Sequence, residues 1–151
     1  MVEPIYDGYR TYVMAAYVKY LEAAGARVVP MMTTEDEATT LDKLSKVNGV
    51  LFPGGGGGTN YTDYGRIIYN KAKEYNDQGN FFPMFGICLG MQNMAIWAST
   101  EGTSVLDNIA AHNISLPLTF EIPPEQTKMF SGLGDEAWNF AKYNITMNSH
   151  S

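Results

Sequence analysis

An alternation of helical and strand-like patterns over residues 12–98 is the feature that most constrains the fold of this chain. Apolar side chains recur at helical spacing in four segments, at residues 12–24, 35–46, 64–79 and 89–98. Short apolar runs typical of buried strands separate these segments, at residues 27–31, 49–52 and 81–87. The alternation predicts an α/β fold centred on a parallel sheet, with right-handed crossover connections.

The boundaries and the second half of the chain give weaker signals. Thr34 and Glu37 have the spacing of a capping box, which predicts the start of the second helix. Farther along, residues 114–122 predict a strand or a pair of strands, broken by Pro117 and closed by Pro123 and Pro124, whereas residues 135–151 show no clean period. From its length we expect one domain, covering residues 1–151.

Composition and charge exclude several classes of partner. The chain has 10 Lys and Arg against 16 Asp and Glu, which gives a formal net charge of -6. Phosphate binding needs a basic footprint, so we expect no nucleic-acid partner. No apolar run approaches the roughly 18 residues that a membrane span needs. We also expect no cofactor and no metal site.

Cellular location has to be inferred from short sequences. Asn60, Asn113 and Asn144 each begin an Asn-x-Ser/Thr sequence, and these candidate glycosylation sites favour the secretory pathway. Residues 1–10 lack the apolar core of a signal peptide, so an export signal would have to lie upstream of them. The single cysteine, Cys88, cannot form an internal disulfide and says little about the redox compartment.

Cys88 stands at a predicted junction of strand and helix, in the sequence GICLG at residues 86–90. Such a turn projects a side chain from the carboxyl edge of the sheet, where α/β proteins bind ligands. The turn is strained and needs small residues two positions away on either side, which Gly86 and Gly90 provide. The helix N-terminus favours a thiolate, and the first helical amide, on Leu89, can donate to an oxyanion.

A second amide donor is expected at the preceding strand end, where Pro53 leads into consecutive glycines at residues 54–58. Without a side chain, the amide of Gly54 or Gly55 can approach a substrate carbonyl closely. A lone cysteine is more often an apolar packing residue, and a glycine run is more often a flexible loop. Finding both features at successive strand ends favours a cysteine nucleophile beside an oxyanion hole.

Over residues 9–148 the chain resembles the gamma-glutamyl hydrolases of the class I glutamine amidotransferase-like superfamily. The similar segments are YVKYLE and AGARVVP within residues 17–30, NGVLFPGG at 48–55, FPMFGICLG at 82–90, LPLTF at 116–120 and NITMN at 144–148. These segments occur in the family's order and spacing, and that agreement carries the resemblance.

The resemblance implies a parallel-sheet-centred, three-layer amidotransferase-like fold that is truncated at both ends. It implies hydrolysis of gamma-linked glutamate chains, typically folyl- and antifolyl-polyglutamates, in lysosomes or outside the cell. The partner is then a small poly-gamma-glutamate molecule. By the same resemblance, Cys88 is the nucleophile, and the backbone amides of Gly55 and Leu89 form the oxyanion hole.

The chain also departs from the family at several positions. The family's first strand should precede Tyr9, and its catalytic histidine, in a Trp-His-Pro-Glu-like motif, would lie beyond Ser151. Ala141 stands where a substrate-contacting histidine is expected. The acidic residue that usually follows the nucleophile is missing from residues 91–93.

The two histidines of the chain, His112 and His150, do not replace the family's base: His112 aligns with no family histidine, and His150 lies at the chain end. A thiolate without a base still attacks, but the leaving amine then lacks a general acid. We therefore expect this chain alone to be inactive.

One alternative function is that of a degenerate domain, serving as a structural subunit whose sheet edges are covered by a second copy or another protein. Another is a glutaminase that delivers ammonia to a synthase.

Overall fold

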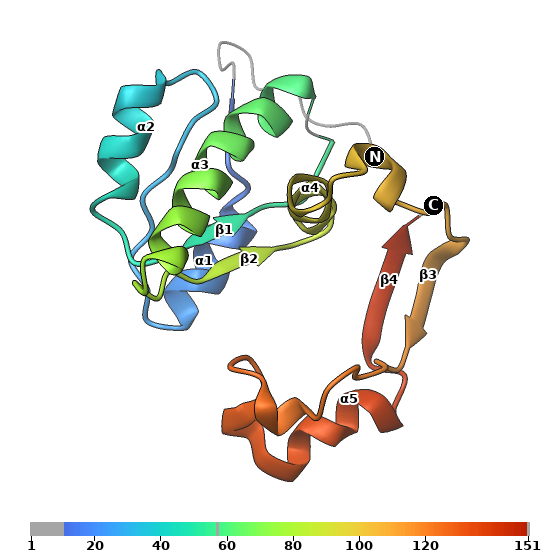
Figure 1. Cartoon of the computed structure of the whole chain (residues 1–151). Helices are drawn as coiled ribbons and strands as arrows, with labels where there is room; N and C mark the ends of the chain where they lie inside the picture. Colours follow the sequence, from blue (N-terminus) through green and yellow to red (C-terminus); the bar gives the residue numbers. More distant parts are fainter. Residues whose placement is uncertain (1–10, 57, 151) are drawn as a thin grey trace. The chain divides into compact units, whose positions relative to one another are not determined.

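A computed structural model describes residues 11–56 and 58–150 of the chain (Figure 1). The segment before Tyr9, where the family's first strand was expected, lies outside the described residues. Internal contacts divide the chain into two compact units, Met1–Leu106 and Asp107–Ser151. Among the residues described, no helix combines the length and the apolar character needed to cross a membrane.

A parallel pair of strands lies at the centre of the first unit, as the alternation predicts. Strand β1, Val50–Phe52, pairs with β2, Met84–Gly86, in a register that sets Phe52 opposite Gly86 (Figure 1). The predicted strand at residues 81–87 is therefore shorter than expected. Pro83 has no N–H to donate to the ladder and contributes only its carbonyl, which accepts from the Val50 amide at 2.9 Å.

Helices flank these strands at nearly all of the predicted positions. They are α1 Ala15–Ala23, α2 Glu37–Leu44, α3 Thr59–Asp77 and α4 Leu89–Ala98, followed by the short 3-10 helix η1 Gly102–Val105. Helix α4 has the bounds that its apolar pattern predicts. Helix α3 begins earlier than its apolar stripe, because its first turn is polar and starts directly after the glycine run. The result is an α/β unit with a parallel sheet.

The predicted capping box of α2 is wrong. Asp36, and not Thr34, caps this helix: its carboxylate accepts from the Thr39 amide at 2.8 Å and from the Thr39 hydroxyl at 3.0 Å. These hydrogen bonds lower the pKa of Asp36 below its ordinary value. Aspartate caps a helix as well as serine or threonine does, and here it stands directly before the helical turn.

The strand predicted at residues 27–31 is absent from the described sheet, which pairs only β1 with β2. Among the described residues the segment has no ladder partner, and Val29 is 47% exposed. Lys43 Nζ of α2 donates to the Pro30 carbonyl at 3.1 Å. This apolar, β-branched run is therefore a connection between α1 and α2 and not a strand. Strand pairing depends on a neighbouring strand, which the local sequence does not specify.

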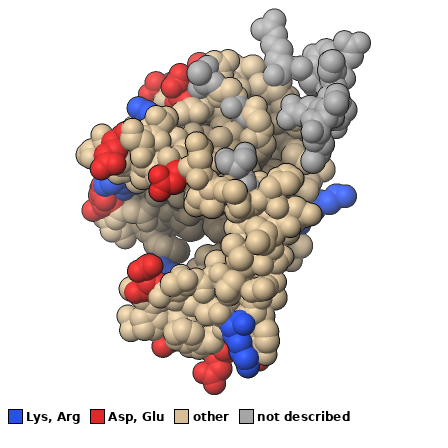
Figure 2. Space-filling view, turned by 90° about the vertical axis from the view of Figure 1, so that its right-hand side faces the viewer, with Lys and Arg blue, Asp and Glu red and all other residues tan. Residues whose placement is uncertain are grey.

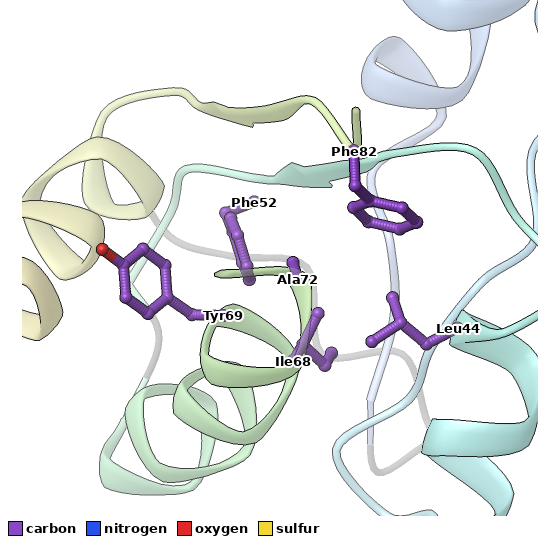
Figure 3. Packing of buried hydrophobic residues seen from close by; sticks show 6 residues of the cluster. All are labelled: Leu44, Phe52, Ile68, Tyr69, Ala72 and Phe82. Carbon is purple, nitrogen blue, oxygen red and sulfur yellow. The ribbon is translucent and has the colours of Figure 1, made fainter. Parts of the chain in front are cut away.

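The core of the first unit forms where α2 and α3 meet the sheet (Figure 3). Six residues make up its buried cluster, namely Leu44, Phe52, Ile68, Tyr69, Ala72 and Phe82. The ring of Trp97 on α4 packs edge-on against Phe52, with centroids 5.2 Å apart, and this contact joins α4 to the core. Each fully buried large side chain contributes about 1.5–3 kcal/mol. This cluster holds both strands, and therefore both strand ends, in place.

Acidic and basic side chains are interspersed on the surface in Figure 2, and eight of them form four pairs on or beside α2 and α3. The pairs are Lys43–Glu35, Lys46–Asp42, Lys71–Glu74 and Lys73–Asp77. Two of these pairs lie within α3, and Lys46–Asp42 joins residues four apart at the end of α2. Such exposed pairs add little to stability, so the first unit is held together mainly by its core.

The second unit is an antiparallel pair of strands with a helical excursion between them (Figure 1). Strand β3, Ala111–Leu116, pairs with β4, Thr146–His150. The predicted strand at residues 114–122 overlaps β3 but ends at Pro117, since proline cannot donate to a ladder.

Three short helices lie between these strands, η2 Pro124–Gln126, η3 Ser131–Trp138 and α5 Asn139–Lys142. Aromatic rings gather there, with Phe130 in contact with both Phe120, at 5.2 Å between centroids, and Phe140, at 5.5 Å. Residues 135–150 gave no periodic signal because they form one turn of 3-10 helix, one turn of α-helix and a short strand in succession.

Candidate active site at Cys88

Cys88 lies between β2 and α4 and occupies the position that caps α4. Its backbone has φ 54° and ψ -117°, a conformation that residues with a side chain rarely adopt. Such strain persists only where the surroundings impose it, and it gathers at functional sites. The side chain is exposed, so the thiol is accessible to solvent at the N-terminal end of a helix.

Gly86 and Gly90 make this turn sterically feasible. A Cβ atom on Gly86 would lie 2.6 Å from the Met91 nitrogen, and one on Gly90 would lie 2.0 Å from the Phe52 carbonyl oxygen. Both distances are far shorter than any real carbon contact, so neither position has room for a side chain. The first turn of α4 therefore packs directly against the end of β1.

The turn at Pro53 and Gly54 lies beside the cysteine. A Cβ atom on Gly54 would be 2.8 Å from the Cys88 Cβ atom and 3.1 Å from the Ile87 carbonyl oxygen. The Ile87 amide donates to the Phe52 carbonyl at 3.0 Å, which continues the pairing of β1 and β2 up to the cysteine. The two strand ends that the sequence singles out are thus brought together.

Two tyrosines bind opposite edges of the peptide unit between Pro53 and Gly54. The Gly54 amide donates to the Tyr17 hydroxyl of α1 at 3.0 Å. On the other edge, the Tyr61 hydroxyl of α3 donates to the Pro53 carbonyl at 2.9 Å. Burial raises the pKa of Tyr61 well above its ordinary value, and the nearby Tyr17 adds to the rise. Tyr61 is thus a neutral hydrogen-bond donor at any physiological pH.

The sequence analysis did not identify these two tyrosine contacts. Tyr17 is 37 positions from Gly54, and Tyr61 is 8 positions from Pro53. No local pattern connects residues so far apart, and the contacts appear only when α1 and α3 take their places around the sheet.

The two predicted oxyanion donors lie on the two segments that meet at this point. Gly55 is exposed and has φ +128°, which a side chain would oppose. Leu89 is the first residue of α4, and the amides of a first helical turn have no intrahelical acceptor. The Gly54 amide, the other donor that the sequence left open, is engaged by Tyr17.

Helix α4 is held in place beyond its first turn by a buried polar contact. Asn93 is 2% exposed, and its side-chain oxygen accepts from the Thr62 hydroxyl of α3 at 3.2 Å. Because α3 also carries Tyr61, the same helix supports both segments of the site.

The other candidate residues lie elsewhere. Asn60 is exposed in the first turn of α3, and Asn113 and Asn144 are exposed in the second unit. His112 is exposed on β3, and His150 ends β4. In the part of the chain that is described, no three or more His, Cys, Asp or Glu side chains gather as a metal site would require.

A family model described as glutamine amidotransferase class-I matches residues 5–145 of the chain. The chain therefore belongs to the class-I glutamine amidotransferase family. Within that family, its sequence is similar to gamma-glutamyl hydrolases, as the resemblance predicted.

Three curated relatives illustrate the similarity. The gamma-glutamyl hydrolase of Rattus norvegicus is 38% identical over 145 residues, covering 93% of this chain and 45% of the relative. Gamma-glutamyl hydrolase 1 of Arabidopsis thaliana is 38% identical over 83% of this chain and 39% of its own length. The gamma-glutamyl hydrolase of Homo sapiens is 32% identical over 92% of this chain and 49% of its own length. The chain spans less than half the length of these relatives.

Proposed function

We propose that the chain carries the nucleophile of a gamma-glutamyl hydrolase and that Cys88 is that nucleophile. The observation that carries the proposal is the strained backbone of Cys88, at φ 54°, with an exposed thiol at the start of α4. The positive end of the helix dipole favours a thiolate at this position. The identity of 32–38% with gamma-glutamyl hydrolases supports the type of bond that is cleaved.

In the proposed reaction the thiolate attacks the carbonyl carbon of a gamma-glutamyl amide. A carbon–sulfur bond forms, and the carbonyl electron pair moves to oxygen as an oxyanion. The amides of Gly55 and Leu89 donate to this oxyanion, one from each strand end. Amides fixed in advance at such a point are worth about 2.7–4 kcal/mol each in comparable enzymes. Collapse of the intermediate breaks the carbon–nitrogen bond, and water then hydrolyses the thioester.

The leaving amine needs a proton, and by analogy with the family a histidine would supply it as general acid. In the family, a histidine of a Trp-His-Pro-Glu-like motif follows a late strand, and no such motif stands in residues 1–151. The hydrolase proposal therefore concerns a protein that contains this chain together with that motif. Removing one member of such a set costs several orders of magnitude in rate.

The proposed substrates are gamma-linked glutamate chains of the folyl-polyglutamate type, and the proposed location is the secretory pathway or lysosome. Support for the location comes from the three exposed acceptor asparagines, Asn60, Asn113 and Asn144. Glycans at these positions would be detected as a mass shift on enzymatic deglycosylation.

Replacing the nucleophile tests the proposal. Cys88→Ala should leave the circular dichroism spectrum unchanged and abolish release of glutamate from folyl-polyglutamate by the protein. Met91→Leu, an exposed neighbour one turn away, is the matched control and should retain turnover. Turnover that survives in Cys88→Ala would remove this cysteine from the mechanism. Assaying glutamine alongside separates the proposal from a glutaminase.

A second candidate function is a catalytically degenerate domain that serves as a structural subunit. It is favoured by the exposed apolar side chains of the second unit, among them Ile109 at 62%, Met129 at 65% and Met147 at 60%. Native mass spectrometry tests this candidate, because a stable, monodisperse monomer of 16.7 kDa would contradict it.

A further inference from the structure

We propose that Tyr61 is a positioning residue that fixes the peptide unit between Pro53 and Gly54, so that Gly55 supplies the oxyanion donor. The inference rests on the proposed function of Cys88 and assigns a role to a side chain on a different element. Tyr61 does not touch the reacting atoms in this scheme. It acts through the backbone of the turn that follows β1.

The peptide unit is held by two hydroxyls on opposite edges. Because the carbonyl and the N–H of a trans peptide point in opposite directions, one hydroxyl at each edge opposes rotation of the whole plane. Tyr61 donates to the Pro53 carbonyl at 2.9 Å, and Tyr17 accepts from the Gly54 amide at 3.0 Å. These contacts come from α3 and α1, so the turn is fixed between two helices.

The turn needs such a restraint because its own sequence supplies little. Glycines at residues 54–56 have no Cβ atoms to limit their dihedral angles, and Gly55 already stands at φ +128°. If the Pro53–Gly54 peptide rotated, the Gly54 amide would leave Tyr17 and the direction of the following amide would change with it. The hydroxyls of Tyr17 and Tyr61 thus engage the Gly54 peptide and leave the Gly55 amide as the oxyanion donor.

A purely structural tyrosine would leave a different signature. Tyr64 lies on the same helix and also binds through its hydroxyl, to the Thr40 hydroxyl at 2.8 Å, but it faces α2 and not the site. Replacing Tyr61 by phenylalanine removes its bond to the Pro53 carbonyl, and replacing Tyr64 removes its bonds to the Thr40 hydroxyl and, at 3.5 Å, to the Glu35 carboxylate. Only the loss at Tyr61 should affect a ligand that uses the oxyanion hole. Tyr64→Phe is therefore a matched control for Tyr61→Phe.

The test uses two thiol reagents that differ in their need for an oxyanion donor. N-acetylglutamate γ-semialdehyde forms a thiohemiacetal: the sulfur bonds to the carbonyl carbon, and the thiol proton ends on the former carbonyl oxygen. That oxygen occupies the position of the oxyanion. Iodoacetamide alkylates the same sulfur and releases iodide, without creating an oxyanion. Intact-mass spectrometry follows both reactions, and neither needs the general acid of the full hydrolase.

In Tyr61→Phe we expect aldehyde binding to weaken by roughly threefold to tenfold, the effect of one neutral hydrogen bond. The alkylation rate should stay within about twofold of the parent protein, and Tyr64→Phe should match the parent in both assays. Equal weakening in Tyr61→Phe and Tyr64→Phe, or no weakening in Tyr61→Phe, would overturn the positioning role alone. A parent protein that is alkylated but binds no aldehyde would overturn the proposed function and this role together.

Discussion

The two strand ends that form the candidate site are fixed in different ways. After β2, the backbone around Cys88 is held by sterics, because Gly86 and Gly90 let α4 pack against β1 at distances that no side chain permits. After β1, the backbone at Pro53 and Gly54 is held by two hydroxyls from other elements. One end is thus specified within five residues and the other across the fold.

The difference sets how each end should respond to substitution. A steric restraint fails abruptly when an atom is added, since the interior cannot absorb a contact near 2 Å. A hydrogen-bond restraint fails gradually, because one neutral bond contributes about 0.5–1.5 kcal/mol. We therefore expect stability to depend mainly on the Cys88 side, and fine positioning on the Pro53 side.

The largest effect is expected at Gly90. A helical Gly→Ala substitution ordinarily stabilises by about 1 kcal/mol, but here the new Cβ atom would lie 2.0 Å from the Phe52 carbonyl oxygen. We expect Gly90→Ala to lower the free energy of unfolding by about 3 kcal/mol, measured by urea denaturation. Gly132→Ala is the control, because its Cβ atom would meet nothing within 4 Å. Equal stability of the two variants would show that the elbow is not sterically fixed.

A smaller effect of opposite sign is expected at Cys88 itself. At φ 54° any side chain is strained, by about 1–3 kcal/mol, and glycine is not. Glycine also costs about 0.4–1 kcal/mol through the entropy of the unfolded chain, so the strain term should prevail. Cys88→Gly should therefore be about 1 kcal/mol more stable than Cys88→Ala in the same denaturation assay. If Cys88→Ala were the more stable variant, the backbone at this position would not be under strain.

The same contrast explains which parts of the fold and of the candidate site could be predicted from the sequence. The α/β alternation, the bounds of α4 and the glycines around Cys88 follow from local patterns, and the structure has them where expected. The strand predicted at residues 27–31 failed because pairing needs a partner elsewhere in the chain. Tyr17 and Tyr61 were missed for the same reason, since their hydroxyls meet the turn only in the folded state.

In the second unit, prediction was limited by the shortness of the elements. Its strand β4 follows two single turns of different helix types, and none of these is long enough to show a period. Pro117 ends β3 because its ring removes a donor, and this local effect placed the boundary from the sequence. Local chemistry therefore placed some ends of elements, such as that of β3, but not others, such as the cap of α2.

The smallest effect is expected at Asp36, which caps α2 through a local hydrogen bond. The sequence had placed this cap two residues earlier, at Thr34. Hydrogen bonds from Thr39 hold the pKa of Asp36 below its ordinary value, so the folded state binds this proton less readily than the unfolded state does. The contribution of Asp36 to stability is therefore present above its ordinary pKa and is lost as pH falls below about 4. Asparagine caps a helix equally well but does not titrate.

Asp36→Asn should match the parent protein in urea denaturation at pH 7. When both are acidified to about pH 3, the parent should lose slightly more stability than the variant. Thr34→Val is the control at the position the sequence favoured, and it should behave as the parent at both pH values, because Thr34 is exposed and does not cap α2. If Thr34→Val lost more stability than Asp36→Ala at pH 7, Thr34 and not Asp36 would be the N-cap of α2, as the capping box predicted.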